Sequence, residues 1–160
     1  MIRAATIADA TRLAAIYNYY ITDTIVTFEE EPLPASEMAR RIEKISASLP
    51  WLVAELDGQV AGYAYGGPWN ERRGYRFAAE VTVYLDQAQG GRGIGSALYG
   101  ALIPMLEERG IHTIIGGIAL PNAASVSLHE KFGMKQVAHY GEVGMKFGKW
   151  IDVGYWQRIL

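Results

Sequence analysis

The 160-residue sequence predicts one α/β domain, built on a mixed and mostly antiparallel β-sheet with helices on both faces. Half of the residues are apolar, and a domain of this size buries roughly 70% of the surface of its unfolded chain. Segments with the two-residue period of strands and segments with helical period follow one another. No repeat, low-complexity tract or Ser/Pro-rich linker divides them, so we expect residues 1–160 to form a single domain.

A short N-terminal strand and two helices are expected first. Thr6 and Asp9 have the spacing of a capping box, and the apolar residues after them recur at helical spacing, which predicts a first helix. A second, charged helix is expected from Ser36 to about Leu49. The apolar positions of the first helix are Leu13, Ile16, Tyr17 and Tyr20.

Three strands are expected next. Trp51–Leu56 and Gln59–Tyr65 flank the dipeptide Asp57-Gly58. This dipeptide favours the tight turn of a β-hairpin, so the two strands should be antiparallel. The third strand contains the apolar segment Val81–Leu85.

A glycine-rich loop, Gln89–Ser96, joins this third strand to a helix and is the most informative stretch of the chain. Glycines let the backbone adopt positive φ and approach a ligand, and the first turn of a helix offers unpaired N–H groups. The loop is therefore expected to hold a phosphate or pyrophosphate; the alternative is a glycine turn that only caps the helix. The helix has one apolar face and stops at Gly110. That face contains Ile94, Leu98, Ala101, Leu102 and Met105.

Two common phosphate loops do not fit this spacing. A Walker loop needs Lys and then Ser or Thr after its last glycine, whereas Gly95 is followed by Ser96-Ala97. A dinucleotide fingerprint needs a third glycine where Ser96 stands, and no acidic residue lies at the required distance. An unrelated nucleotide-binding domain stays a remote alternative, and preferential binding of ATP or NAD would support it.

The C-terminal part continues the alternation of strands and helices. A strand is expected from His112 to Leu120, and Asn122 should cap a helix that ends at Phe132-Gly133. Two further strands, about Lys135–Gly144 and Ile151–Ile159, are expected to complete the sheet.

Composition limits the partners and the compartment. The formal charge is −2 and no basic run is present, so we expect neither a nucleic-acid nor a membrane partner. The absence of Cys excludes disulfides and thiolate chemistry and fits a reducing compartment. No signal-peptide core and no apolar run of about 20 residues occur, and we therefore expect a cytoplasmic protein.

Arg92–Leu98, following the Val81–Leu85 strand, resembles the pyrophosphate loop of the GNAT superfamily of acyl-CoA-dependent N-acyltransferases. It departs at Gly90, where that superfamily usually has Gln or Arg. Six further segments resemble the phosphinothricin and methionine sulfoximine acetyltransferases within it. These segments are Thr27–Glu29, Gly66–Trp69, Glu80–Tyr84, Leu120–Ser125, Leu128–Glu130 and Asp152–Gln157. The resemblance implies the GNAT fold, acetyl-CoA as the acetyl donor, a small amino-acid analogue as substrate, and a homodimer; the apolar stretch Trp150–Trp156 also favours dimerisation.

Glu80 is the first candidate catalytic residue. Alternation along the strand places it on one face with Thr82 and Tyr84. Burying a carboxylate in a central strand is costly, and partial burial would raise its pKa toward that of a useful base. The structural alternative is an ion pair with an arginine of the segment Arg72–Arg76. The resemblance implies that Glu80 is the general base that deprotonates the substrate ammonium.

His129 is the second candidate. It stands on a largely apolar helical stripe near the end of its helix, where an imidazole is also favourable against the helix dipole without any catalytic role. Many members of the superfamily have Tyr at the matching position, thought to protonate the departing CoA thiolate, whereas the resembled acetyltransferases have His. The imidazole could act as that acid or within a base relay.

The resemblance also implies the contacts with the acetyl donor. The backbone of Val83, Tyr84 and Leu85 should hydrogen-bond to the pantetheine arm and polarise the thioester carbonyl. The pyrophosphate should lie on the loop residues Gly91, Arg92, Gly93, Ile94, Gly95 and Ser96. Asn122 could touch the cofactor, with a simple N-cap as the alternative. No metal site is expected, because His112, His129 and His139 lack ligand spacing.

On the substrate side the resemblance points to four residues, Phe28, Glu29, Trp69 and Arg72. Arginine suits an anionic substrate because its guanidinium makes bidentate contacts, although Arg73 and Arg76 remain alternatives and solvated surface charge is possible for all three. Phe147 stands where some phosphinothricin-specific relatives have His, which leaves methionine sulfoximine or another small amine open.

The expected mechanism is direct attack of the amine on the thioester within a ternary complex. An acyl-enzyme is not expected, because Cys is absent and no Ser stands beside an evident base in the sequence. The competing hypothesis is a non-catalytic module that binds acyl-CoA, and turnover of acetyl-CoA with a panel of amines separates the two.

Overall fold

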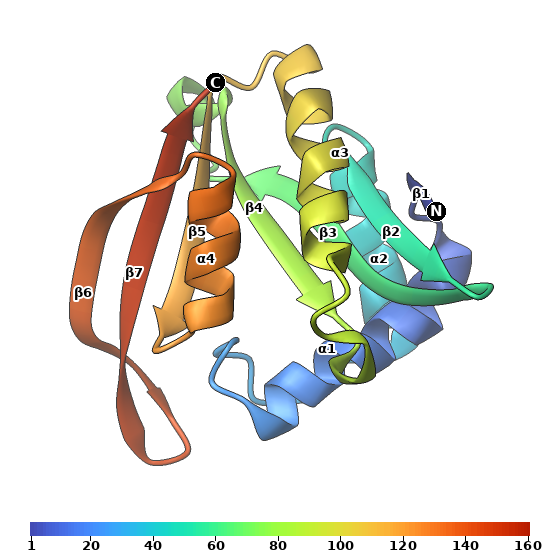
Figure 1. The fold of residues 1–160 in the computed structure, drawn as a ribbon, viewed down its shortest axis with the longest axis horizontal. Helices are drawn as coiled ribbons and strands as arrows, with labels where there is room; N and C mark the ends of the chain where they lie inside the picture. Colours follow the sequence, from blue (N-terminus) through green and yellow to red (C-terminus); the bar gives the residue numbers. More distant parts are fainter.

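The computed structural model describes residues 1–160 and contains one seven-stranded sheet (Figure 1). The strand order is β1-β2-β3-β4-β5-β7-β6. Every neighbouring pair is antiparallel except β4 and β5, which are parallel. The prediction of a mixed, mostly antiparallel sheet is therefore confirmed. The strands are β1 (Ile2–Ala4), β2 (Trp51–Leu56), β3 (Gln59–Pro68), β4 (Ala78–Leu85), β5 (Thr113–Leu120), β6 (Lys135–Lys146) and β7 (Lys149–Ile159).

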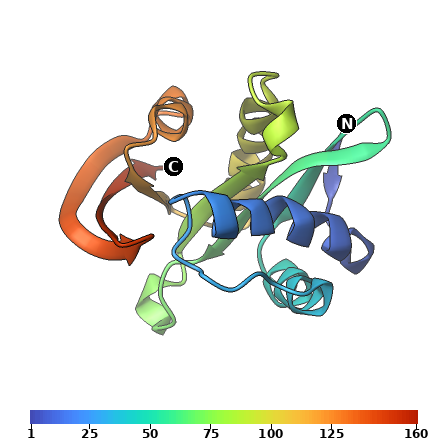
Figure 2. The same cartoon turned by 90° about the horizontal axis from the view of Figure 1, so that it is seen from below.

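Helices cover both faces of the sheet, as expected (Figure 2). α1 (Ala10–Asp23) and α2 (Ala35–Ser46) pack on one face, around Val53. α3 (Ile94–Glu108) and α4 (Ala123–Lys131) lie on the other, where α3 provides most of the second core. None of the four helices combines the length and the apolar character that a membrane crossing requires.

The first two helices differ from the prediction at their ends. Thr6 N–H donates to Asp9 Oδ2 at 2.8 Å, but the residues between them form a 3₁₀ turn, and α1 begins only at Ala10. α2 runs from Ala35 to Ser46 and is shorter than expected at its C-terminal end. Helix ends depend on local capping more than on apolar period, which explains these shifts.

Two tight hairpin turns set the register of the strands. Asp57 and Gly58 have φ of 50° and 75°, as a type I′ turn requires, and this confirms the predicted hairpin. Phe147 and Gly148 take the same conformation, with φ of 52° and 72°. Because that turn has only two residues, β6 and β7 extend to Lys146 and Lys149, beyond the predicted strand ends.

The two parallel strands separate soon after they begin. Their register covers only Ala78–Glu80 of β4 opposite Thr113–Ile115 of β5. Beyond Glu80 the two strands diverge (Figure 1). The peptide groups on this side of β4 consequently have no strand partner there, and the gap in the sheet is where the candidate site is found.

Candidate functional site

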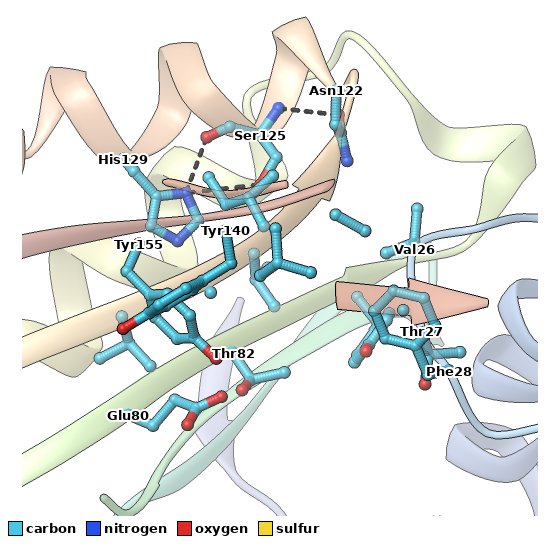
Figure 3. A pocket seen from close by; sticks show the side chains of 18 of the residues that line it. Val26, Thr27, Phe28, Glu80, Thr82, Asn122, Ser125, His129, Tyr140 and Tyr155 are labelled. Atoms are coloured by element: carbon cyan, nitrogen blue, oxygen red, sulfur yellow. Dashed lines mark hydrogen bonds between the residues drawn. The ribbon is translucent and has the colours of Figure 1, made fainter. Parts of the chain in front are cut away.

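A cavity of about 700 Å³ lies where β4 and β5 separate (Figure 3). Its walls come from β4, β5, α3, α4, the loop after α1 and the β6–β7 hairpin. The lining residues with polar side chains are Thr27, Glu80, Thr82, Tyr84, Tyr99, Asn122, Ser125, His129, Tyr140 and Tyr155. The cavity therefore gathers both candidate catalytic residues, Glu80 and His129, from different elements.

Glu80 enters the cavity from β4 with a carboxylate that has no ion-pair or hydrogen-bond partner. Burial raises the pKa of this carboxyl above its ordinary value of 4.5, because the charged form loses solvation. The alternative of an ion pair with a neighbouring arginine is not realised. The side chains of Arg72, Arg73 and Arg76 are exposed and form no salt bridge.

His129 lines the cavity from α4 and is only 4% exposed. Its Nδ1 lies 2.7 Å from the backbone oxygen of Ser125, and its Nε2 lies 3.2 Å from the hydroxyl of Tyr99. Burial lowers the pKa of His129 below its ordinary value of 6.5. Burial therefore favours the neutral form of the imidazole.

Ser125 corrects one expectation from the sequence, namely that no serine stands beside a base. Its Oγ lies 3.4 Å from His129 Nδ1. That nitrogen carries the proton of the hydrogen bond to the Ser125 carbonyl, because a carbonyl oxygen can only accept. Nδ1 consequently cannot deprotonate the hydroxyl, and the arrangement does not form a serine nucleophile pair.

The glycine loop has the backbone of an anion cradle. Gly91 and Gly93 have φ of 77° and 73°, and a Cβ at either position would meet no atom within 4 Å. Gly93 is the N-cap of α3, so the free N–H groups of the first helical turn lie directly beside this open loop. Lys131 Nζ donates to Ser96 Oγ at 3.0 Å and adds a positive charge that the sequence did not reveal.

The glycines of this loop are required for different physical reasons. Gly95 is buried, and a Cβ there would lie 3.2 Å from Leu128 Cδ2 of α4. Its small size is explained by helix packing, whereas Gly91 and Gly93 are explained by backbone conformation. Arg92 is exposed and forms no ion pair.

The free edge of β4 runs from the cavity toward this loop. Asp86 N–H donates to Ala61 O of β3, so the carbonyl of the same peptide, Leu85 O, points to the opposite side, where β5 has moved away. Tyr20 Oη donates to this carbonyl at 2.5 Å. The N–H groups of Val83 and Leu85, two residues apart on one strand, share that open side. Tyr84 places its ring against the α1–α2 core.

Asn122 has the structural role that the sequence left as an alternative. Its Oδ1 accepts a hydrogen bond from Ser125 N at 3.1 Å, which caps α4. The side chain also lines the cavity (Figure 3), so its amide group can still face a ligand.

The predicted substrate residues fall into two groups. Phe28 lines the cavity and packs so closely on Gly144 that a Cβ there would lie 2.3 Å from the ring. Glu29 does not line the cavity, because its carboxylate pairs with Arg41 at 2.6 Å and accepts a hydrogen bond from Tyr17. Arg41 lowers the pKa of Glu29 below its ordinary value.

Trp69 and Arg72 lie outside the cavity lining, on the segment between β3 and β4. The ring of Trp69 contacts Tyr155 of the cavity wall edge-to-face, with centroids 5.7 Å apart. Arg72 is exposed, with its backbone N–H bound to Asn70 Oδ1. This segment leads directly into Glu80, and it contacts the cavity wall through Trp69.

Several cavity residues were missed from the sequence. Tyr99, Ser125, Tyr140 and Tyr155 come from four different elements, and their convergence depends on the tertiary fold. Thr82 could have been found, because alternation already placed it on the face of Glu80. No three His, Cys, Asp or Glu side chains come close enough together to hold a metal ion.

Comparison with known proteins gives consistent matches over nearly the whole chain. Residues 2–154 match the acetyltransferase (GNAT) domain family. The chain is 41% identical to a phosphinothricin N-acetyltransferase of Streptomyces viridochromogenes, covering 98% of this chain and 86% of that one. It is 35% identical to an L-methionine sulfoximine/L-methionine sulfone acetyltransferase of Pseudomonas paraeruginosa, covering 98% and 92%. A phosphinothricin acetyltransferase structure from Sinorhizobium meliloti, in complex with acetyl-CoA, superposes with a TM-score of 0.97 at 33% identity, covering 100% and 88%.

Proposed function

The chain belongs to the GNAT family of acetyltransferases, and on that premise we propose that it acetylates the amino group of a small amino-acid analogue such as phosphinothricin or methionine sulfoximine. The observation that carries the proposal is Glu80, a half-buried carboxylate without a partner in a cavity beside a free strand edge. An ammonium group has no lone pair for attack, so a base of raised pKa is what this reaction needs.

The residues present fit acetyl-CoA as the acetyl donor. Gly91 and Gly93 leave the loop open beside the first turn of α3, which suits a pyrophosphate. The N–H groups of Val83 and Leu85 on the open side of β4 would hold the pantetheine arm. When bound, acetyl-CoA supplies the activated thioester.

Glu80 would accept the proton of the substrate ammonium, directly or through water. The N–H groups on the open edge of β4 would donate to the negative charge that develops on the acetyl oxygen. Direct transfer agrees with the absence of a Cys nucleophile and with the donor role of His129 Nδ1 toward Ser125 O. No acyl-enzyme is required.

The lack of a cationic side chain in the cavity lining leads us to assign the anion site to an arginine outside that lining. No Lys or Arg is among the lining residues, whereas the proposed substrates carry a carboxylate. Arg72, Arg73 and Arg76 are exposed and free of ion pairs, on the segment that leads into Glu80. Arg72 is the first choice, because the resemblance to the phosphinothricin acetyltransferases points to it.

We expect the active molecule to be a homodimer formed through the β6–β7 hairpin. β6 is an edge strand, and an exposed apolar edge favours pairing with another chain. The exposed apolar residues of the hairpin, which we call the hairpin patch, are Val137, Tyr140, Val143, Met145, Phe147 and Trp150. Three of these residues, Tyr140, Val143 and Met145, also line the cavity, so a second copy would lie next to the site.

Turnover of acetyl-CoA with phosphinothricin, methionine sulfoximine and methionine sulfone tests the proposal. Arg72→Ala should raise KM for the preferred substrate roughly ten- to a hundred-fold, because charged hydrogen bonds contribute about 1.5–3 kcal/mol. Acetyl-CoA affinity should not change, and Arg72→Lys should recover only part of the loss. A penalty larger for phosphinothricin would assign Arg72 to the phosphinate, and equal penalties would assign it to the shared carboxylate.

Two outcomes would contradict the proposal. Tight acetyl-CoA binding without turnover of any amine would indicate the non-catalytic module. Turnover confined to amines without an acidic group would indicate a different small-amine acetyltransferase. Unchanged KM in Arg72→Ala would move the anion site to Arg73 or Arg76, and the same measurements on these two arginines would follow.

A further inference from the structure

The imidazole of His129 has a hydrogen-bond partner on each nitrogen. Nδ1 lies 2.7 Å from Ser125 O, which can only accept, so Nδ1 carries the proton. Nε2 of the neutral ring is then an acceptor, and it lies 3.2 Å from the hydroxyl of Tyr99. Tyr99 is therefore the donor of this second hydrogen bond. Burial raises the pKa of Tyr99 far above its ordinary value, so the phenol keeps its proton.

A charged imidazole would disrupt this arrangement. With both nitrogens protonated, the oxygen of Tyr99 would have to accept from Nε2–H, and its own hydroxyl proton would need another acceptor. Tyr99 is fully buried, and its hydroxyl has no hydrogen-bond partner other than His129. An unsatisfied donor in such a place is costly. The geometry thus favours the neutral ring.

The surroundings of His129 contain no group that would offset this preference. On β5, Gly116 lies against the ring so closely that a Cβ there would be 2.6 Å from Nε2. Glu80 of β4, Tyr140 of β6 and Tyr155 of β7 share the cavity, but none of them is hydrogen-bonded to His129. The neighbouring charged groups of α4 are occupied elsewhere, as Glu130 accepts from Trp156 and Lys131 donates to Ser96.

We propose that Tyr99 is a positioning residue that, together with the Ser125 carbonyl, holds His129 as a neutral imidazole protonated on Nδ1 with its Nε2 lone pair facing the Tyr99 hydroxyl. The catalytic consequence rests on the proposed function: His129 then has no proton on Nε2 to give to a departing thiolate, and its Nε2 lone pair is engaged by the Tyr99 hydroxyl. Of the two roles open for His129, the base relay is the one left, and it requires that Tyr99 release this hydrogen bond.

Nitrogen-15 NMR of the histidine side chains tests the proposal in the ligand-free protein. His129 is identified among the three histidines by the signals that disappear in His129→Asn. In the wild type we expect a protonated Nδ1 and an unprotonated Nε2 with the shift of a hydrogen-bonded acceptor. In Tyr99→Phe, Nε2 should move to the shift of a free acceptor, and the pKa of His129 should rise by up to about one unit, the worth of one neutral hydrogen bond.

Tyr63→Phe is the matched control, because Tyr63 is as buried as Tyr99 but belongs to the other core and does not line the cavity. It should leave the His129 signals unchanged. In activity assays, Tyr99→Phe should shift the acidic limb of the kcat/KM profile to higher pH, whereas Tyr63→Phe should not.

A protonated Nε2 in the wild type, or an unchanged Nε2 shift and pKa in folded Tyr99→Phe, would overturn the proposal. A loss of the folded state in Tyr99→Phe is monitored by thermal unfolding, and the wild-type tautomer alone then decides. The NMR result does not depend on turnover. Failure of the proposed acetyl transfer and failure of this inference are therefore distinguishable.

Discussion

Glu80 holds its carboxylate on a central strand of the sheet without a partner. Desolvation of this charge lowers the stability of the fold. The neighbouring arginines could have neutralised it and do not. Burial raises its pKa above 4.5, so the folded protein binds a proton on Glu80 more tightly than the unfolded chain does. Stability therefore falls as the pH rises from the ordinary carboxyl pKa through the raised one.

Replacement of Glu80 by Gln should separate activity from stability. We expect kcat/KM to drop by roughly 10²- to 10⁴-fold near neutral pH, the usual contribution of a general base. The loss should shrink at high pH, where the substrate amine is already neutral. A loss that is uniform across pH would instead indicate a binding or structural role.

The same variant should be more stable than the wild type at pH 7, because the buried charge is gone. This gain should vanish as the pH falls below the ordinary carboxyl range, and thermal unfolding at several pH values measures it. Glu43→Gln, on the exposed surface of α2 and without an ion pair, is the control and should leave both kcat/KM and stability unchanged.

Single residues of the site were predictable where chemistry and alternation agree. Glu80 was predicted because burying a carboxylate in a central strand costs free energy, which indicates a functional role. Glu29 could not be judged from the sequence, because its partner Arg41 lies on the next helix and only the fold brings the two together. The hydrogen bond between Tyr99 and His129 was missed for the same reason, since it joins α3 to α4.

At the scale of elements, turn chemistry explains which boundaries were predictable. Asp57-Gly58 is a preferred type I′ pair, and the predicted hairpin was correct. Phe147-Gly148 takes the same conformation, but Phe rarely adopts positive φ, so this two-residue turn could not be predicted from residue preferences. The predicted strands consequently ended at Gly144 and began at Ile151, whereas the observed ones reach Lys146 and Lys149.

The glycine loop permits a test that distinguishes conformation from ligand contact. Gly93→Ala should lower acetyl-CoA affinity at least several-fold, measured by calorimetry, because the added Cβ strains a residue with φ of 73° and intrudes on the open loop. Gly58→Ala carries nearly the same strain, with φ of 75° and open space around it, but lies in a remote hairpin. It should lose stability without losing affinity. Equal affinities in both variants would remove the cradle assignment.

Lys146 joins the β6–β7 hairpin to the segment that carries Phe28. It is 3% exposed and its Nζ donates to the backbone oxygens of Thr27, at 2.6 Å, and Tyr20, at 3.3 Å. We expect Lys146→Met to reduce the free energy of unfolding by about 1–3 kcal/mol, because a buried carbonyl loses its donor. KM for the amine should rise, since Phe28 lines the cavity, while acetyl-CoA affinity should hold.

Lys149→Met is the matched control for the Lys146 hydrogen bonds, because Lys149 lies on the same hairpin, is exposed and makes no side-chain hydrogen bond. Denaturant unfolding and steady-state kinetics of the two variants give the comparison. If Lys149→Met raises KM as much as Lys146→Met, the cause is the loss of a positive charge from the hairpin and not the loss of the Lys146 hydrogen bonds.

At the scale of the whole molecule, the hairpin patch predicts the oligomeric state. Light scattering at micromolar concentration should give twice the chain mass of 17.6 kDa. Trp150→Glu, at a residue 63% exposed in the patch, should shift the mass to that of the monomer, because a carboxylate cannot be buried there without cost. Ile7→Glu, 64% exposed but outside the patch, should remain dimeric. A monomeric wild type would refute the prediction.

The early separation of β4 from β5 also affects how the molecule opens. It divides the sheet into a four-stranded and a three-stranded part, joined at three residue pairs. The core under α3 spans both parts, but few ladder hydrogen bonds join them, so we expect the amide hydrogens beside the gap to exchange separately in the two parts. A ligand lying in the gap would contact both parts and connect them. Its binding would slow exchange in both parts at once and raise the free energy of unfolding by an amount that grows with the ratio of ligand concentration to Kd.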